Sequence, residues 1–207
     1  MRIRNVLLDW SGTLADDLPP VVDATNKVLA HYGVEPFTRD SFRREFCLPF
    51  TKFYDRVLPG VPITDLDPIY TKHFDASDEI VEELPGARAF LEHCAGSGRR
   101  VFLLSSIKHH HFETQADALG FSEFFEHPYT EVWDKTERIA HILDDHGLDR
   151  SETLFAGDMQ HDIDTAKHGG VLAVATLTGY DSREELERSE PDLIVDDLSH
   201  LIDHELL

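Results

Sequence analysis

Short apolar runs recur along the chain, and longer stretches in which apolar residues follow helical spacing separate most of them. Four of the runs are almost unbroken, which is typical of strands buried on both faces of a parallel sheet. A fifth run, at the start of the chain, is interrupted by Arg4 and Asn5. The pattern predicts strands at residues 3–8, 101–104, 153–156, 171–175 and 193–195.

Stretches with helical spacing lie between these predicted strands. The predicted helices cover residues 86–95, 110–119, 135–146 and 161–168. A glycine directly follows each of them, and glycine readily adopts the left-handed conformation that ends helices. The alternation of strands and helices predicts an α/β fold with a doubly wound parallel sheet.

Residues 15–84 interrupt this alternation, because they contain helical spacing without a convincing strand. A connection of this length between two neighbouring strands far exceeds an ordinary crossover. Prolines are expected to divide the segment into short helices, at Pro19, Pro20, Pro36, Pro49, Pro59, Pro62 and Pro68. We therefore expect a Rossmann-like core of residues 1–14 and 85–207, with an inserted helical cap subdomain at residues 15–84.

Composition narrows the class of partner. Among 207 residues, 19 Lys and Arg stand against 40 Asp and Glu, so the formal net charge is −21. Such a chain is repelled by nucleic acids and anionic membranes, whereas a small anionic substrate needs only a local positive patch. The two cysteines indicate a reducing compartment, and neither a signal peptide nor a membrane-spanning run is expected. We predict a cytoplasmic protein, and monomer and homodimer both remain open.

Polar side chains gather where the predicted strands end. The first strand leads into Asp9-Trp10-Ser11-Gly12-Thr13-Leu14, the second into Ser105-Ser106, and the third into Gly157-Asp158-Met159-Gln160-His161-Asp162, while Lys135 opens the preceding helix. Ligands of open parallel sheets bind at this carboxyl edge. Carboxylates suit Mg²⁺, and hydroxyl, backbone N–H and ammonium groups suit phosphate oxygens. The predicted phosphate donors are Gly12, Ser105, Ser106 and Lys135.

These four motifs, in this order, resemble those of the haloacid dehalogenase (HAD) superfamily hydrolases, in the branch similar to phosphoglycolate phosphatases and phosphonatases. The resemblance implies that Asp9 is the nucleophile and a Mg²⁺ ligand and that Asp158 is a ligand. Asp162 would be a further ligand or a supporting carboxylate, and residue 11 would offer its backbone carbonyl. Ser105 and Lys135 would hold the phosphoryl group. The family usually has proline after this lysine, and Thr136 stands there instead, which leaves Lys108 as an alternative.

Residue 11 departs from the phosphatases of this superfamily, which usually carry a second aspartate there as general acid and base. Ser11 cannot ionise near neutral pH, and such a loss typically costs about 10²–10⁴ in rate. Our preferred prediction is still a Mg²⁺-dependent phosphatase that acts on a small phosphorylated metabolite through an aspartyl-phosphate. Two alternatives stay open. One is a phosphonoacetaldehyde hydrolase-like enzyme that cleaves a C–P bond with Lys52, and the other is a catalytically weak phosphate-binding or regulatory protein.

The predicted cap contains a locally basic strip. Residues 39–56 carry Arg39, Arg43, Arg44, Lys52 and Arg56 against three acidic residues. Ordinary solvated helices would give the same pattern. Alternatively, the strip binds a second anionic group of the substrate, and Arg43 and Lys52 are the candidate contacts.

Overall fold

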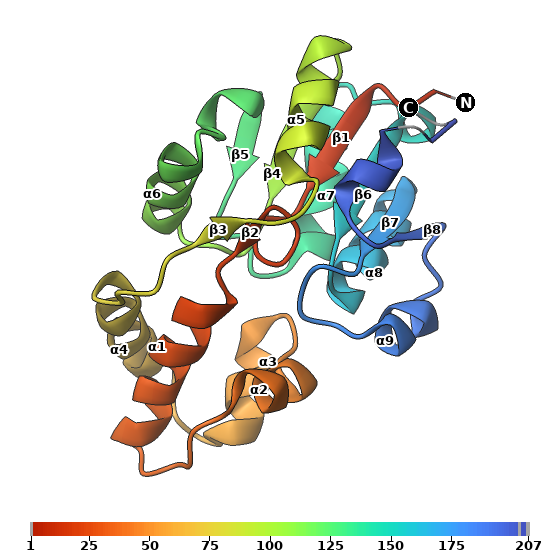
Figure 1. The fold of residues 1–207 in the computed structure, drawn as a ribbon. Helices are drawn as coiled ribbons and strands as arrows, with labels where there is room; N and C mark the ends of the chain where they lie inside the picture. The colour runs from red at the N-terminus through yellow and green to blue at the C-terminus, as the bar shows by residue number, and fades with distance from the viewer. Residues whose placement is uncertain (1, 203, 206–207) are drawn as a thin grey trace. The chain divides into compact units, whose positions relative to one another are not determined.

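The structure is a computed structural model that describes residues 2–202 and 204–205. The chain forms two compact units: a core of the residues up to Asp16 together with those from Glu83 onward, and a helical unit, Asp17–Glu82. Each boundary between the two units lies two residues from the boundary expected from the sequence. Figure 1 follows the chain from the core into the helical unit and back.

A six-stranded sheet forms the centre of the core unit, in the order β5-β4-β1-β6-β7-β8. The strands are β1 (Asn5–Leu8), β4 (Arg100–Leu104), β5 (His127–Tyr129), β6 (Thr153–Gly157), β7 (Leu172–Thr176) and β8 (Leu193–Val195). Every pairing between neighbours is parallel. β1 lies in the middle with all four residues buried. The prediction of an α/β fold with a parallel sheet is confirmed.

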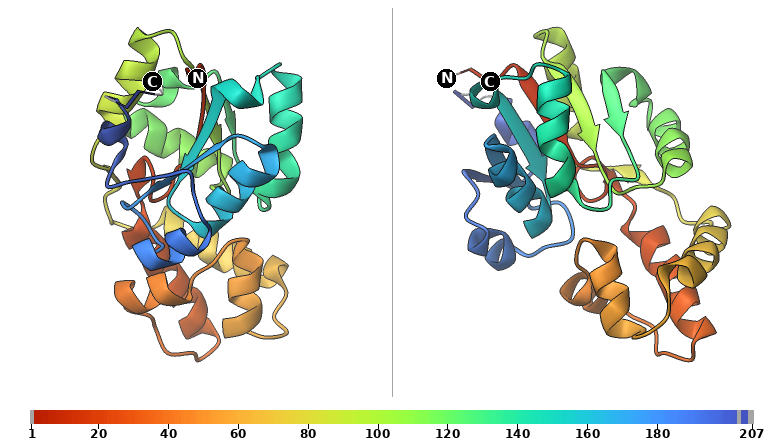
Figure 2. Two further views of the ribbon diagram at one scale, coloured as in Figure 1. Left: turned by 90° about the vertical axis from the view of Figure 1, so that its right-hand side faces the viewer. Right: turned by 180° about the vertical axis from the view of Figure 1, so that it is seen from behind.

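Helices cover both faces of this sheet. They are α5 (Ala87–Gly96), α6 (His109–Leu119), α7 (Lys135–Asp145), α8 (Gln160–Gly169) and α9 (Arg183–Arg188). α7 and α8 pack on one face of the sheet, which is turned toward the viewer in the right-hand view of Figure 2, and α5 lies on the other face. Gly120 and Gly170 end α6 and α8 in the left-handed conformation. The four helices expected between the strands are thus confirmed, with ends shifted by one residue or so.

Some elements of the core were not expected, among them β5, α9 and a small second sheet. β5 has only three residues and contains Pro128, so it lacks the apolar run by which longer strands are recognised. α9 lies in the acidic C-terminal part, where a capping box between Ser182 and Glu185 begins the helix. A two-stranded sheet of β2 (Ala15–Asp16) and β3 (Glu82–Glu83) forms where the chain leaves and re-enters the core. All three form through local turns or pairing with distant residues, and no regular spacing of apolar residues marks them in the sequence.

The helical unit consists of α1 (Leu18–His31), α2 (Arg39–Glu45), α3 (Phe50–Val57) and α4 (Ile63–Asp75). Its interior contains aromatic rings that meet edge to face, with centroids 5.6 Å apart for Phe42 and Phe53. The expectation that each proline separates two helices is wrong for Pro68, which lies inside α4. It is also wrong for Pro19 and Pro20, which occupy the first turn of α1, where a backbone N–H has no helical partner to lose. Within the described residues of either unit, no helix is long and apolar enough to cross a membrane.

Candidate active site

The loop after β1 holds Asp9 at the carboxyl edge of the sheet. The Asp9 N–H donates to the Ala156 carbonyl at 3.0 Å, which extends the pairing of β1 with β6 by one residue. The chain then turns tightly, and the Leu14 N–H donates to the Trp10 carbonyl at 2.8 Å. The buried Trp10 indole donates to Oε1 of Gln115 at 2.6 Å. The loop is therefore anchored on both sides of Asp9, and only 3% of the surface of Asp9 is exposed.

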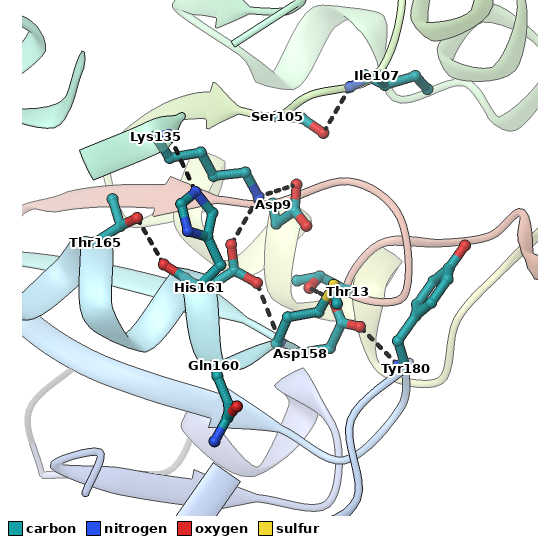
Figure 3. Close-up of polar contacts among 12 residues, drawn as sticks. Asp9, Thr13, Ser105, Ile107, Lys135, Asp158, Gln160, His161, Thr165 and Tyr180 are labelled. Carbon is teal, nitrogen blue, oxygen red and sulfur yellow. Dashed lines mark hydrogen bonds and ion pairs between the residues drawn. The ribbon is translucent and has the colours of Figure 1, made fainter. Parts of the chain in front are cut away.

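Lys135 lies fully buried between two carboxylates at this edge. Its Nζ is 2.8 Å from Oδ1 of Asp9 and 2.7 Å from Oδ1 of Asp162, as Figure 3 shows for Asp9. Burial by itself lowers the pKa of an ammonium, but the two carboxylates outweigh it and raise the pKa of Lys135 above its usual value. Lys135 therefore remains a cation. Lys108, the alternative, directly precedes α6.

Asp158 sits in a space that two glycines leave open. Its Oδ1 accepts from the Thr13 hydroxyl at 3.0 Å, and its Oδ2 accepts from the Tyr180 N–H at 2.8 Å (Figure 3). A Cβ atom on Gly12 or Gly179 would clash with this carboxylate. Gly12 also has a φ of +75°, which disfavours other residues. Gly12, within the loop that follows Asp9, is thus required both for the turn and for the close approach of Asp158.

Asp162 lies in the first turn of α8 and turns back toward β6. Its Oδ2 accepts from the Met159 N–H at 3.1 Å, which leaves Oδ1 for the Lys135 ammonium. A Cβ on Gly157 would clash with the Asp162 side chain. Because Asp158 and Asp162 are close in the sequence, this turn brings their carboxylates close together.

The carboxylates of Asp9, Asp158 and Asp162 fit a divalent cation. One oxygen of each lies within 4.8 Å of the others, and all three residues are buried. Burial raises the pKa of Asp9, although Lys135 opposes the shift, and burial also raises the pKa of Asp158. Three buried carboxylates thus face one ammonium, and a hard divalent cation with oxygen ligands would balance them. Ser11, the predicted backbone ligand, lies half-buried in the same loop.

The predicted phosphate donors are not all available in this geometry. Ser105 follows β4 and is buried, and its Oγ accepts from the Ile107 N–H at 3.3 Å, which leaves its hydroxyl proton to donate (Figure 3). Ser106 is half-buried beside it. The Gly12 N–H, which we expected to bind phosphate, donates instead to the Ala15 carbonyl at 2.9 Å because the loop turns so tightly. In this structure Gly12 serves the turn.

Sequence reasoning missed the groups that hold the start of α7. The Lys135 N–H donates to Nε2 of His161 at 3.1 Å, and the Thr136 N–H donates to Oδ1 of Asp134 at 3.0 Å. These bonds satisfy the two N–H groups at the helix start, so a proline after Lys135 is not needed. Burial lowers the pKa of His161 to about 4, which keeps its ring neutral and able to accept. The signal was present, since His161 lies between Asp158 and Asp162, the two predicted ligands of the fourth motif.

The loop after β7 was also missed. The Thr178 hydroxyl donates to the Gly12 carbonyl at 2.7 Å, and Oδ2 of Asp181 accepts from the Gln160 N–H at 2.7 Å. Burial raises the pKa of Asp181 to about 6. Both residues follow the predicted strand at residues 171–175, so reading that strand end as the others were read would have found them.

Arg43 and Lys52, the predicted substrate contacts, lie in the helical unit. Arg43 is in α2 and Lys52 is in α3, where its side chain is exposed. Two other members of the basic strip already face carboxylates, Arg39 near Glu79 at 3.6 Å and Arg56 near Glu45 at 3.4 Å. The strip is therefore less basic than its sequence indicates.

Comparison with known proteins agrees with this geometry. A phosphoglycolate phosphatase of Pseudomonas fluorescens (strain Pf0-1) is 24% identical over 96% of this chain and 78% of its own length. A 5'-nucleotidase of Pseudomonas aeruginosa is 26% identical, covering 97% of this chain and 95% of its own. A predicted phosphatase from Clostridium acetobutylicum has the same fold, with a TM-score of 0.88 at 16% identity and coverage of 98% and 97%.

The family model described as haloacid dehalogenase-like hydrolase matches residues 6–176. This span runs from the strand that precedes Asp9 through β7 and contains the buried lysine and all three carboxylates. The chain therefore belongs to the haloacid dehalogenase-like hydrolase family.

Proposed function

We propose that the protein is a Mg²⁺-dependent phosphatase that hydrolyses a small phosphorylated metabolite through an aspartyl-phosphate on Asp9. The observation that carries the proposal is the buried group of Asp9, Asp158 and Asp162 at the carboxyl edge of the sheet, with Lys135 between Asp9 and Asp162. Relatives that match nearly the whole chain are named phosphoglycolate phosphatase, 5'-nucleotidase and pyrophosphatase, and these names support the same reaction class.

Asp9 supplies the nucleophile in this proposal. One Asp9 oxygen attacks phosphorus, the P–O bond to the leaving group breaks, and the phosphoryl group is bound to the carboxylate. Water then attacks phosphorus and releases Asp9 and inorganic phosphate. Lys135 stays protonated and, with the Ser105 hydroxyl, stabilises the negative oxygens of the transferred group.

A divalent cation would be held by Asp9 and Asp158, with Asp162 beside them. Bound there, it would supply positive charge for the phosphoryl oxygens. The protein's own part is to orient the carboxylates, which Thr13, the Tyr180 N–H and Lys135 do through their hydrogen bonds. We expect EDTA to abolish turnover and Mg²⁺ to restore it.

Ser11 has a consequence for the choice of substrate. A serine hydroxyl does not ionise near neutral pH, so it is a poor proton donor to a departing oxygen. Substrates whose leaving group is stable as an anion, such as acyl phosphates and phosphoanhydrides, need no such donor. We therefore propose that the enzyme favours these over alkyl phosphate esters.

A series of leaving groups tests this proposal. Acetyl phosphate, p-nitrophenyl phosphate and an alkyl phosphate are compared in the parent protein and in Ser11→Asp. We expect kcat/KM of the parent to fall steeply as the leaving group becomes more basic. Ser11→Asp should raise the rate for the alkyl ester by about 10²–10⁴ and leave acetyl phosphate nearly unchanged.

Asp9→Asn is the control for the nucleophile, and it should abolish turnover of every substrate. Equal gains for all substrates in Ser11→Asp would contradict the leaving-group argument. Full activity in Asp9→Asn would contradict the aspartyl-phosphate.

Arg43 and Lys52 are our candidate contacts to a second anionic group of the substrate. Replacing either by Ala should raise KM for the true substrate much more than for p-nitrophenyl phosphate, which has no second anion. Equal effects on the two substrates would remove this part of the proposal. Borohydride trapping of a carbonyl substrate on Lys52 would instead support the C–P hydrolase alternative.

A further inference from the structure

The amino edge of the core sheet, where β1 and β4 begin, carries a cavity of about 410 Å³. Two short segments line it, one leading into β1 and one leading into β4. The lining residues are Arg2, Ile3, Arg4, Asn5, Ser97, Gly98, Arg99 and Arg100. β1 runs from this edge to the opposite one, where Asp9 lies, so the cavity is separate from the candidate active site.

Positive charge gathers in this cavity against the charge of the chain. Four of its eight lining residues are arginines and none is acidic, although the chain as a whole has a net charge of −21. Guanidinium groups brought together repel one another, and an anion between them relieves the repulsion. The guanidinium groups of Arg2 and Arg4 also offer planar sets of N–H donors that match phosphate or carboxylate oxygens, while Arg99 and Arg100 add positive charge.

Neighbouring carboxylates do not remove this character. Arg4 lies 3.4 Å from Glu152, and Arg100 lies 2.6 Å from Glu126. All four side chains are at least one third exposed. Arg100 forms two hydrogen bonds to Glu126 and stays paired, whereas the exposed Arg4–Glu152 pair is of the kind that contributes little to stability. An anion can therefore compete with Glu152 for Arg4.

The cavity wall is held in place before any ligand arrives. Arg99 is only 8% exposed, its Nε donates to the Ile3 carbonyl at 3.2 Å, and its guanidinium also donates to the Ser97 hydroxyl. The two lining segments are joined by the main chain as well, since the Arg100 N–H donates to the Arg4 carbonyl at 3.0 Å. A wall that is already ordered loses little entropy on binding.

We propose that this cavity, which we call the arginine pocket, binds a small anion with two or more negative groups, such as a diphosphate. Its volume lies in the range of small-molecule sites, roughly 300–1,000 Å³. One charged group could not contact guanidinium groups from both lining segments as well as two linked groups can. A compact polyanion is therefore the ligand class that the pocket fits best.

The experiment titrates metal-free ¹⁵N-labelled full-length protein with methylenediphosphonate and follows backbone amides by NMR. We expect saturable shifts at residues 2–5 and 97–100. The double variant Arg2→Gln/Arg4→Gln should weaken binding by about tenfold or more, because each lost guanidinium removes a charge-assisted hydrogen bond to the anion. Arg183→Gln is the matched control, since Arg183 is an exposed, ion-paired arginine of the core that does not line the pocket.

Three outcomes would overturn the proposal. The first is an absence of saturable shifts at the lining residues, and the second is shifts confined to the surroundings of Asp9 and Ser105. The third is an equal loss of affinity in Arg183→Gln and in the double variant. Shifts at the lining residues that only the double variant weakens support it. The substitutions precede β1, whereas the catalytic Asp9 follows its other end, so turnover should be unchanged and reports independently on the proposed function.

Discussion

The two edges of the core sheet carry opposite charges in opposite environments. At the carboxyl edge, buried carboxylates surround one buried ammonium, and the residues are Asp9, Asp158, Asp162 and Lys135. At the amino edge the charged groups are the arginines of the arginine pocket, of which Arg2 and Arg4 are exposed, Arg100 is half-buried and Arg99 is buried. A buried charge depends on its partners, whereas an exposed charge keeps its water. Substitutions should therefore have large, coupled effects at the first edge and small, separable effects at the second.

The largest effect is expected for Lys135→Met. This change leaves the carboxylates of Asp9 and Asp162 buried without their shared cation, and loss of one partner of a buried pair costs about 3–5 kcal/mol. Urea unfolding in EDTA measures the loss, and turnover should disappear with it. Mg²⁺ should recover part of the stability, because it offsets the same negative charge.

Lys167→Met is the matched control for this prediction. Lys167 faces Glu190 at 3.7 Å on the surface, and both side chains are more than 40% exposed. Its replacement should change the free energy of unfolding by less than about 1 kcal/mol. Similar losses in the two variants would break the comparison between buried and exposed charge.

At the carboxyl edge of the sheet, the sequence could predict the residues that directly follow a strand. Parallel strands end at one edge of a sheet, so a reading of strand ends was enough to gather Asp9, Ser105 and Asp158. The fold class followed from the alternation of buried strands and helices. The period of the apolar residues and the position of polar residues after each strand can both be read directly from the sequence.

Other features depend on partners that are distant in the sequence. The Lys135 N–H reaches His161, 26 residues away, and the Thr178 hydroxyl reaches Gly12, 166 residues away. No local pattern predicts such bonds. The Gly12 N–H was expected to bind phosphate because it lies at the carboxyl edge of the sheet, but the tight turn uses it internally. β5 escaped notice because pairing with β4, rather than apolar period, makes it a strand.

A smaller effect is expected for His161→Leu. The Lys135 N–H would lose its acceptor, and an unsatisfied buried donor costs about 1–3 kcal/mol. Because Lys135 also has to meet the phosphoryl group, we expect kcat to fall about ten- to a hundredfold with a smaller change in KM. Steady-state kinetics and urea unfolding measure the two effects separately.

His161→Gln is the conservative counterpart, since its amide oxygen can accept from the same N–H. It should recover most of kcat. If both variants lost equal activity, the ring would have some role other than holding the start of α7.

The next effect concerns Asp181, whose carboxylate accepts the Gln160 N–H at the start of α8. Burial raises its pKa to about 6 in the folded protein, from 3.8. The folded state therefore holds this proton more tightly than the unfolded state, so the contribution of Asp181 to stability falls as the pH rises from about 4 to about 6. Asp181→Asn keeps an oxygen acceptor and removes the titration.

We therefore expect Asp181→Asn to be more stable than the parent protein at pH 7.5, by about 1–2 kcal/mol once solvent screening is allowed for. The advantage should vanish near pH 4. Melting temperatures of both proteins across this range, in EDTA, measure the difference. An advantage that does not change with pH would mean that the carboxyl group is not the cause.

The smallest effect is expected at the amino edge, for Arg4→Gln. The Arg4 and Glu152 side chains are 72% and 34% exposed, so breaking their ion pair should cost less than about 0.5 kcal/mol. Removing one guanidinium also relieves repulsion within the arginine pocket, which opposes even that small loss. Urea unfolding at low and high salt should give nearly equal values for variant and parent, whereas methylenediphosphonate should stabilise the parent more. A large loss without ligand would mean that the arginines of this edge hold the fold together, as the buried charges of the other edge do.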